Sequence, residues 1–470
     1  MPLPDLIGAQ REVVCLDHKG HTVVLGTAGS GKTTMAVHRA AYLSNPGTAH
    51  SGRTLLLSFN NSLLAYLSYL RPPELDEVDI RTYHHFARGY LKGQGAMGNR
   101  WICQKPERLV AKALKQTQQR SPDNRFLQRP LRFFTTETRW MAQQGVTSLD
   151  EYLAIERVGR GDEGALGAKQ RTTMFDVFET YRAIRAEEGY RFDWHDIATR
   201  VSEELAQDDS PRRYRHIVID EGQDFSPVML RSLAAAIPAD GSLTFFGDVA
   251  QQVYGRRLSW RQAGLEITAP WRFERNYRNS PQIAKVGLAI SEMPYFAEEA
   301  DMVAPTEFAA EGPMPTLVRC GSNAEEIEFA IEQARAASES ASVAVLVRRH
   351  EDEAPFMRAF KREGRRLHKN MRDWSPDPGV SYGVVHNAKG YEFDTVILVG
   401  LSEERWPDPG AIEGEGEADA EASDGRLLYV GVTRARSALI ITYAGNRSSL
   451  LPSDQGLWAD VDYRTLSTRS

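Results

Sequence analysis

The chain has few cysteines: there are three, Cys15, Cys103 and Cys320, and they lie far apart in the sequence. Isolated cysteines support neither a disulfide framework nor a cysteine-based zinc site, so we expect a reducing, cytoplasmic setting. No apolar run approaches the length of a membrane span, and the first residues lack the apolar core of a signal peptide. The sequence therefore predicts no membrane partner.

An excess of positive charge is also missing, because 57 Lys and Arg residues stand against 63 Asp and Glu residues. The segment 411–424 alone holds six of these carboxylates, so the rest of the chain is balanced and a local basic groove for a polyanion remains compatible with the sequence. This segment shows no apolar periodicity. We expect it to form a flexible acidic surface loop without a function of its own.

The length and composition are those of a globular protein with more than one core. A chain of 470 residues suggests two to four subdomains. Hydrophobic residues make up 41% of it and charged residues 26%, which is ordinary for a soluble fold.

The most informative stretch, 26–34, fits the phosphate-binding pattern G-x-x-x-x-G-K-[ST] in full. An apolar run at 23–25 precedes it and an amphipathic stretch at 35–43 follows, which predicts the strand and helix that this loop requires. Glycines allow backbone N–H groups to converge on a phosphate chain, a lysine adds a point charge, and a hydroxyl can bind Mg²⁺. We expect a nucleoside triphosphate to be held by Gly29, Ser30, Gly31, Lys32, Thr33 and Thr34. The loop alone leaves open a motor, a switch or a kinase.

Two further apolar runs end in groups suited to hydrolysis. The strand predicted at 216–219 leads into Asp220 and Glu221. We expect Asp220 to bind Mg²⁺ through water and Glu221 to act as the base for the attacking water. The strand predicted at 243–246 leads towards Gln251, which is suited to sense the γ-phosphate.

Other strand ends carry residues that could bind a nucleic-acid backbone or stack on a base. Phe59 and Asn60 follow the strand predicted from 54, and Thr82 and His84 follow the one predicted from 80. Capping and core packing explain each of these residues about equally well. A basic and aromatic cluster after 247 adds Tyr254, Arg256 and Trp260 as candidates.

Upstream of the loop, the sequence predicts a short helix at residues 7–14. Its Gln10 could pair with the edge of adenine. Residues 89–200 change character: they show helical periodicity, and we expect most of their aromatics, such as Trp101, Phe134 and Trp194, to be core. We interpret this region as a helical insertion into the first sheet domain.

In this order, the motifs resemble the UvrD/Rep/PcrA group of superfamily 1 helicases, the 3′→5′ DNA motors. Residues 273–280 look like the group's motif IV, 386–394 like motif V and 426–436 like motif VI, and the resemblance spans about residues 7–442. It implies an α/β fold with two RecA-like P-loop NTPase domains, mostly parallel sheets and a helical insertion in the first. The implied boundaries are 1–88 with 201–268 for the first domain, 89–200 for the insertion and 269–470 for the second.

The resemblance also implies roles for single residues. Gln10 would read adenine, Tyr277 would stack on it and Glu392 would bind the ribose. Arg278 and Arg434 would be arginine fingers from the second domain, which makes hydrolysis depend on closure of the cleft. The residues implied to contact single-stranded DNA, or a junction with duplex, are Phe59, Asn60, Thr82, His84, Tyr254, Arg256, Trp260 and His386.

The chain departs from the group in places. Only about 105 residues separate motifs IV and V, so the inserted 2B subdomain is minimal or absent. Val384 stands where a threonine is usual, Ser423 and Asp424 precede motif VI in place of a Glu pair, and Gly255-Arg256 replace the aromatic that commonly follows Tyr254. These changes favour an intact ATPase with weak strand separation.

The resemblance thus implies an ATP- and Mg²⁺-dependent translocase on single-stranded DNA, acting in repair, recombination or phage defence. No nuclease signature is present, so cutting would need a partner such as a nuclease subunit. Two alternatives stay open: a DNA-stimulated ATPase switch that licenses such a partner, and a helicase that acts on RNA. A small-molecule kinase would leave Gln251, Arg278, Glu392 and Arg434 unexplained.

Overall fold

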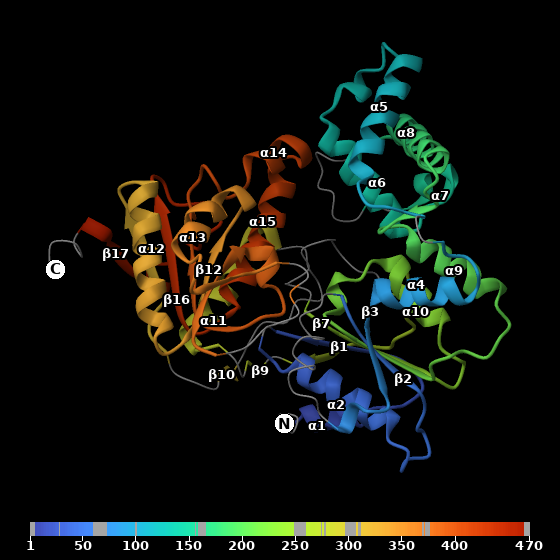
Figure 1. Ribbon diagram of the computed structural model, residues 1–470, viewed down its shortest axis with the longest axis horizontal. Coiled ribbons are helices and arrows are strands. Elements are labelled where there is room, and N and C mark those ends of the chain that lie inside the picture. Colours follow the sequence, from blue (N-terminus) through green and yellow to red (C-terminus); the bar gives the residue numbers. More distant parts are fainter. Residues whose placement is uncertain are drawn as a thin grey trace.

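The computed structural model of the protein describes residues 5–27, 29–59, 73–98, 101–155, 157, 166–248, 260–273, 275–276, 279–296, 307–308, 312–368, 371 and 377–464. These residues form two α/β domains and a group of helices inserted into the first domain (Figure 1).

The first domain is built on a six-stranded parallel sheet in the order β3-β2-β6-β7-β1-β8. Its strands are β1 (Gly20–Gly26), β2 (Thr54–Ser58), β3 (Val78–Thr82), β6 (His216–Asp220), β7 (Ser242–Gly247) and β8 (Trp271–Phe273). All residues of β2, β6 and β7 are buried, as expected for parallel strands covered by helices on both faces. Because the strands are parallel, their carboxyl ends share one edge of the sheet.

Helices cover both faces of this sheet and give it two hydrophobic layers. One layer centres on Leu25, Leu57 and Ile219, and the other on Val24, Leu56 and Val218, so successive residues of a strand serve opposite faces. The helices are α1 (Gln10–Val14), α2 (Lys32–Ser44), α4 (Tyr83–Gly93), α9 (Ile197–Gln207) and α10 (Pro227–Ala235), with short 3₁₀ turns at Pro73–Leu75 and Gly222–Asp224.

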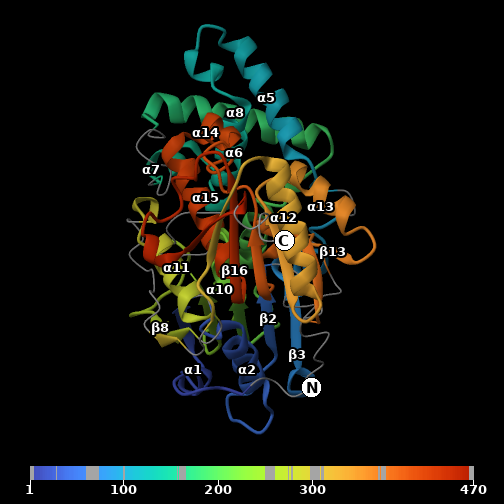
Figure 2. The same ribbon diagram turned by 90° about the vertical axis from the view of Figure 1, so that its left-hand side faces the viewer.

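The insertion has a hydrophobic core of its own, which includes Phe134, Met141, Tyr152, Met174 and Phe178. Its elements are β4 (Ile102–Cys103), α5 (Pro106–Arg120), the 3₁₀ turn Arg125–Gln128, α6 (Leu131–Gln144), α7 (Leu149–Ala154), α8 (Ala168–Glu187) and β5 (Phe192–Asp193). The short strands β4 and β5 pair where the chain enters and leaves it. Figure 2 shows the insertion at the opposite end of the molecule from α1 and α2.

The second domain is built on a seven-stranded parallel sheet in the order β13-β14-β12-β15-β16-β11-β17. Its strands are β11 (Thr316–Cys320), β12 (Ser342–Val347), β13 (Gly364–Arg366), β14 (Gly379–Val384), β15 (Phe393–Leu398), β16 (Ala435–Ala444) and β17 (Ala459–Asp462). A separate pair, β9 (Arg275–Asn276) and β10 (Glu307–Phe308), precedes it.

The helices of the second domain pack on this sheet around two further core clusters. They are α11 (Pro281–Ser291), α12 (Asn323–Ser338), α13 (Ala354–Ala359), α14 (Pro409–Glu415) and α15 (Glu417–Val432), with 3₁₀ turns at Pro294–Phe296, His350–Glu353, Val385–Ala388 and Gln455–Leu457. The implied fold class, two mostly parallel α/β domains with a helical insertion in the first, is confirmed.

The prediction of a flexible acidic loop at 411–424 is wrong, because these residues belong to α14 and the first half of α15. The reason is pairing with distant parts of the chain. Asp424 is buried and accepts two hydrogen bonds from the Arg348 guanidinium, at 3.0 and 2.7 Å, and a third from the Asp408 backbone N–H. α14 also packs against α6 of the insertion.

One buried histidine gives the fold a testable pH dependence. His216 begins β6, and its ring nitrogens lie 2.8 Å from Ser242 Oγ and 2.9 Å from the His50 carbonyl oxygen. Burial lowers the pKa of His216 to about 4 from 6.5. His216 therefore takes up a proton at a higher pH in the unfolded chain than in the folded protein. The free energy of unfolding consequently decreases as pH falls from about 6.5 towards 4.

We expect the unfolding free energy of the wild type to fall by about 2 kcal/mol more than that of H216Q between pH 7.5 and pH 5, measured by denaturant titration. The exposed His85 provides the control, since H85Q should follow the wild type. Parallel pH dependence of wild type and H216Q would contradict this assignment.

Candidate functional site

The phosphate-binding loop lies between β1, which ends at Gly26, and α2, which begins at Lys32. Gly29 and Gly31 have φ angles of 78° and 82°, in the left-handed region that favours glycine. A Cβ added to Gly31 would also lie 2.5 Å from Nε2 of Gln10. Thr33 and Thr34 stand in the first turn of α2, whose N-terminus points at the loop.

Polar groups of the loop turn inwards. Lys32 Nζ donates to the carbonyl oxygens of Gly26 at 2.8 Å and Thr27 at 2.5 Å, and lies 3.7 Å from Asp248 Oδ2. Within the described part of the chain, the buried hydroxyls of Thr27 and Ser30 have no hydrogen-bond partner. A cation, two unsatisfied hydroxyls and a helix N-terminus around one loop fit a phosphate group.

The pair Thr33 and Asp220 fits a magnesium ion. Thr33 Oγ1 donates to Asp220 Oδ2 at 3.0 Å, although the two residues come from α2 and the end of β6. Burial, and then the neighbouring Glu221, raises the pKa of Asp220 to about 7. A divalent cation would stabilise the charged carboxylate, and Mg²⁺ typically takes only one or two protein oxygens besides phosphates and water. No group of three His, Cys, Asp or Glu side chains that could hold a metal occurs among the described residues.

Glu221 follows Asp220 directly and has an unusual backbone conformation. Its φ of 52° is the one positive value found at a non-glycine residue in the described ranges, a strain that is typical of functional positions. Burial raises the pKa of Glu221, but Lys389, Arg434 and Lys32 outweigh it, so the net shift is downwards. Gln223 Nε2 donates to the Glu221 carboxylate, and its Oε1 accepts from the Asp248 backbone N–H at 2.9 Å. The carboxylate is therefore charged and oriented.

The second domain supplies cations to the acidic segment of the first domain, residues 220–224. Lys389, in the turn before β15, donates to Asp224 Oδ1 at 2.6 Å, and both side chains are buried. Arg434 follows α15, is 2% exposed, and lowers the pKa values of Glu221 and Asp224. The site is thus assembled from both domains.

Buried amides fix the segment that carries Arg434. Asn279 Nδ2 donates to the carbonyl oxygens of Thr433 at 3.2 Å and Ala435 at 2.5 Å, and Asn276 Nδ2 donates to Asn279 Oδ1 at 2.8 Å. Two stretches that lie about 150 residues apart in the sequence are held together in this way.

Gln10, which the resemblance implies would read adenine, lies beside the loop. Its Nε2 donates to the Ser30 carbonyl at 3.0 Å and its Oε1 accepts from the Ile7 N–H at 2.9 Å. The segment after α1 is fixed by buried Arg39 of α2, which donates to the carbonyl oxygens of Val14 at 2.9 Å and Leu16 at 2.6 Å.

Other predicted site residues of the second domain lie near one another in the chain but differ in surroundings. Glu392 pairs with Arg436 at 3.1 Å and is about a quarter exposed, so a ribose could reach it. His386 lies in the 3₁₀ turn Val385–Ala388, where burial lowers its pKa to about 3. A neutral imidazole can contact DNA only as a polar group without charge.

The predicted DNA contacts at the ends of β2 and β3 come together. Phe59 and His84 meet edge to face at 6.2 Å, and Thr82 caps α4 by accepting from the His85 N–H. Trp194, one of the aromatics of the insertion, meets the His84 ring edge to face at 5.1 Å. Its carbonyl lies 3.1 Å from His84 Nε2.

Trp260 has a different environment from the other predicted DNA contacts. Its ring packs edge to face on Phe245 at 5.1 Å against the first domain's core. The remaining predicted site residues lie outside the described residues: Asn60, Gln251, Tyr254, Arg256, Tyr277 and Arg278.

Sequence reasoning missed several members of the site. Gln223, Asp224, Asp248, Asn279 and Lys389 all contact or order it, yet none was a candidate. A signal existed for two of them: Asp224 belongs to the same acidic turn as Asp220, and Lys389 precedes a glycine in the turn of motif V.

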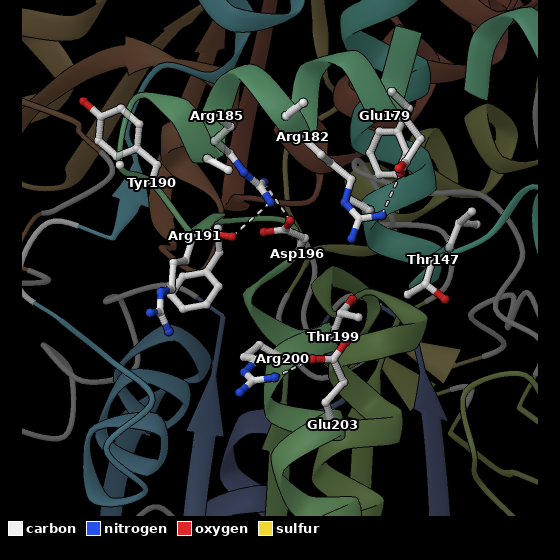
Figure 3. A pocket seen from close by; sticks show the side chains of 17 residues that line it. Thr147, Glu179, Arg182, Arg185, Tyr190, Arg191, Asp196, Thr199, Arg200 and Glu203 are labelled. Carbon is white, nitrogen blue, oxygen red and sulfur yellow. Dashed lines mark hydrogen bonds and ion pairs between the residues drawn. The ribbon is translucent and has the colours of Figure 1, made fainter. Parts of the chain in front are cut away.

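A second cavity, of about 740 Å³, lies between α8 of the insertion and α9 of the first domain (Figure 3). Three of its four arginines pair within it: Arg182 with Glu179 at 2.8 Å, Arg200 with Glu203 at 2.9 Å, and Arg185 with Asp196 at 2.7 Å. The fourth, Arg191, lies over the Trp101 ring at 3.7 Å. These pairs leave little net charge for an anion. Arg185 therefore serves to tie the insertion to the chain that leaves it.

Taken together, the fold and the loop define a nucleotide-binding protein with two RecA-like domains. Residues 6–272 match the UvrD/REP helicase N-terminal domain, and residues 367–446 match the UvrD-like helicase C-terminal domain. The first match alone covers more than half of the chain. The chain therefore belongs to the UvrD/REP helicase family, and it is an ATP-dependent DNA helicase of that family. No helix in the described ranges is long and apolar enough to cross a membrane.

Named relatives agree with this family. The chain is 24% identical over 560 aligned positions to ATP-dependent DNA helicase UvrD2 of Mycobacterium tuberculosis, which covers 93% of this chain and 78% of the relative. It is 24% identical over 479 positions to DNA helicase IV of Escherichia coli, covering 91% of this chain and 66% of the relative. A short match to ATP-dependent DNA helicase PcrA of Staphylococcus aureus is 39% identical over 69 residues, 15% of this chain and 9% of the relative.

We expect Q10A to raise the KM for ATP about tenfold, because its two hydrogen bonds beside the loop are lost. We also expect it to reduce the preference for ATP over GTP, because the implied contact of the Gln10 amide with adenine is lost. Steady-state hydrolysis of both nucleotides measures this. The neighbouring R11A, at an exposed position, should behave like the wild type. Unchanged nucleotide preference in Q10A would refute the role of Gln10 in reading the base.

Proposed function

We propose that this protein hydrolyses ATP, with Mg²⁺, between its two domains in order to move along single-stranded DNA in the 3′→5′ direction. The observation that carries the proposal is the composite site, in which Lys389 of the second domain pairs with Asp224 of the first, three residues after Glu221. Lys389 and Arg434 also lower the pKa of Glu221. Hydrolysis at such a site depends on how the domains are arranged, and a motor needs that dependence.

The residues proposed for hydrolysis have separate tasks. Lys32 and the loop N–H groups would hold the phosphates, while Thr33 and Asp220 would hold Mg²⁺, which supplies charge neutralisation when bound. Glu221 would accept a proton from the attacking water. Arg434 would neutralise charge that develops on the transferred phosphoryl group, an effect that is worth roughly 10³ to 10⁵ in rate.

The ATP site and the proposed DNA contacts share one edge of the first sheet. In the strand register, Ser58 is opposite both Asp220 and Thr82, so Thr82 lies two strands, about 10 Å, from the Mg²⁺ ligand. Phe225 follows Asp224 directly, and its ring meets Phe59 at 5.9 Å. A shift of the acidic segment would therefore reach the aromatic groups proposed to hold the strand.

The chain is compact compared with its relatives. The alignment with UvrD2 spans 560 positions, more than the 470 residues of this chain, so that relative carries inserted segments that this chain lacks. Residues 312–368 between motifs IV and V are used for the second sheet domain itself. We infer that the protein translocates but separates DNA strands weakly unless a partner, such as a nuclease subunit, supplies further DNA contacts.

The test is steady-state ATP hydrolysis with single-stranded DNA of increasing length at fixed salt. Translocation predicts stimulation that grows with length until it reaches a plateau, and E221Q should bind ATP but lose turnover by at least about 10²-fold. Length-independent stimulation would favour the switch, and equal stimulation by matched RNA would remove the preference for DNA. Wild-type turnover in E221Q would contradict the assigned base.

Direction is measured separately, by release of streptavidin from biotin at one end of the strand. Movement 3′→5′ predicts ATP-dependent release from the 5′ end and little release from the 3′ end. The opposite pattern would overturn the proposed polarity, and release from neither end would leave the switch as the better description.

A further inference from the structure

The buried ion pair between Lys389 and Asp224 bonds the second domain directly to the segment 220–224 of the first. Nζ and Oδ1 lie 2.6 Å apart, and the two side chains are 5% and 1% exposed. Such a pair forms only if the domains meet in one arrangement, because either charge would be costly to bury alone.

The turn that carries Lys389 also holds Arg434. Lys389 follows Ala388, whose side chain is buried in the second domain's core, and Gly390 turns the chain with a φ of 83°. The next carbonyl, that of Tyr391, lies 3.5 Å from Nη1 of Arg434. The Phe393 N–H donates to the Arg434 carbonyl at 3.0 Å. Lys389 and Arg434 are therefore parts of one rigid unit.

Asp224 is likewise fixed to the proposed base. It belongs to the 3₁₀ turn Gly222–Asp224, which Glu221 precedes, and its N–H donates to the Glu221 carbonyl at 3.0 Å. Gln223 of the same turn donates to the Glu221 carboxylate. A bond to Asp224 thus positions the second domain relative to Glu221.

We propose that Lys389 is a positioning residue for ATP hydrolysis: its ion pair with Asp224 docks the turn that holds Arg434 beside Glu221. The inference rests on the proposed hydrolytic function of this cleft. Burial raises the pKa of Asp224, while Lys389 and, to a smaller extent, Arg434 lower it, which agrees with a carboxylate that is stabilised by cations of the second domain. Gln10, Lys32 and Thr33 all belong to the first domain, so the proposed contacts to the phosphates and Mg²⁺, and that of Gln10 to the base, do not depend on the pair.

The first test compares K389M with the wild type in the full-length protein. We expect kcat for DNA-stimulated hydrolysis to fall at least about tenfold, while the affinity for a fluorescent ATP analogue stays within about twofold. K389R, which keeps the charge, should recover most of the loss. K361M, at an exposed lysine of the same domain, is the matched control and should behave like the wild type.

The second test asks whether Lys389 acts through Arg434. If it does, K389M should reduce single-turnover hydrolysis much less in an R434M background than in the wild type, because the group to be positioned is already gone. Equal reductions in both backgrounds would overturn the proposal. D224N should likewise make K389M less damaging, since no uncompensated carboxylate is then buried.

The outcomes separate this inference from the function on which it rests. A wild-type protein without ATPase contradicts the proposed function and the inference together. An active wild type with K389M equal to K361M contradicts the inference alone. A parallel loss of kcat and nucleotide affinity in K389M would indicate a general structural role instead and would also overturn it.

Discussion

The structure depends on the need to neutralise carboxylates gathered at one edge of the first sheet. Asp220, Asp224 and Asp248 are each at least 94% buried, and half-buried Glu221 lies among them. Charges in a poorly solvated site are stable only beside charges of opposite sign. One of the cations, Lys32, comes from the loop in the same domain, and the others come from the second domain. The chemistry of the edge therefore determines how the two domains meet.

This arrangement links the ends of the strands to the rest of the fold. Parallel strands bring residues from distant parts of the sequence to one edge, and the insertion leaves that edge through a single pair of short strands. The aromatic groups of Phe59 and His84 lie on the same edge as the acidic segment. The residues proposed for nucleotide chemistry and those proposed for DNA contact are thus neighbours at one edge of this sheet.

Much of the fold and the phosphate-binding loop could be predicted from local sequence. The loop from Gly26 to Thr34 has a fixed pattern because its backbone conformation requires glycine, and buried strands such as 216–219 are recognisable as continuous apolar runs. The structure has the loop between a strand and a helix, as predicted, and β6 covers the predicted strand. The motif order then implied the two-domain fold, which the strand topology confirmed.

Contacts between distant residues could not be predicted in the same way. Asp224 and Lys389 are 165 positions apart, and the residues around either one do not indicate that the two side chains pair. The acidic stretch 411–424 was predicted to be a loop for the same reason, since Asp424 is stabilised by Arg348, which is 76 positions away. Most aromatics of the insertion were expected to be core, but Trp194 packs on His84 at a strand end.

We propose that the hydrolytic site is complete only when the second domain contributes to it. The most direct measurement is single-turnover ATP hydrolysis by R434A with saturating nucleotide and single-stranded DNA, alongside the nucleotide affinity of the same variant. A composite site predicts unchanged affinity and a rate lower by roughly 10³-fold or more. Hydrolysis near the wild-type rate would show that the first domain suffices, and it would contradict the claim.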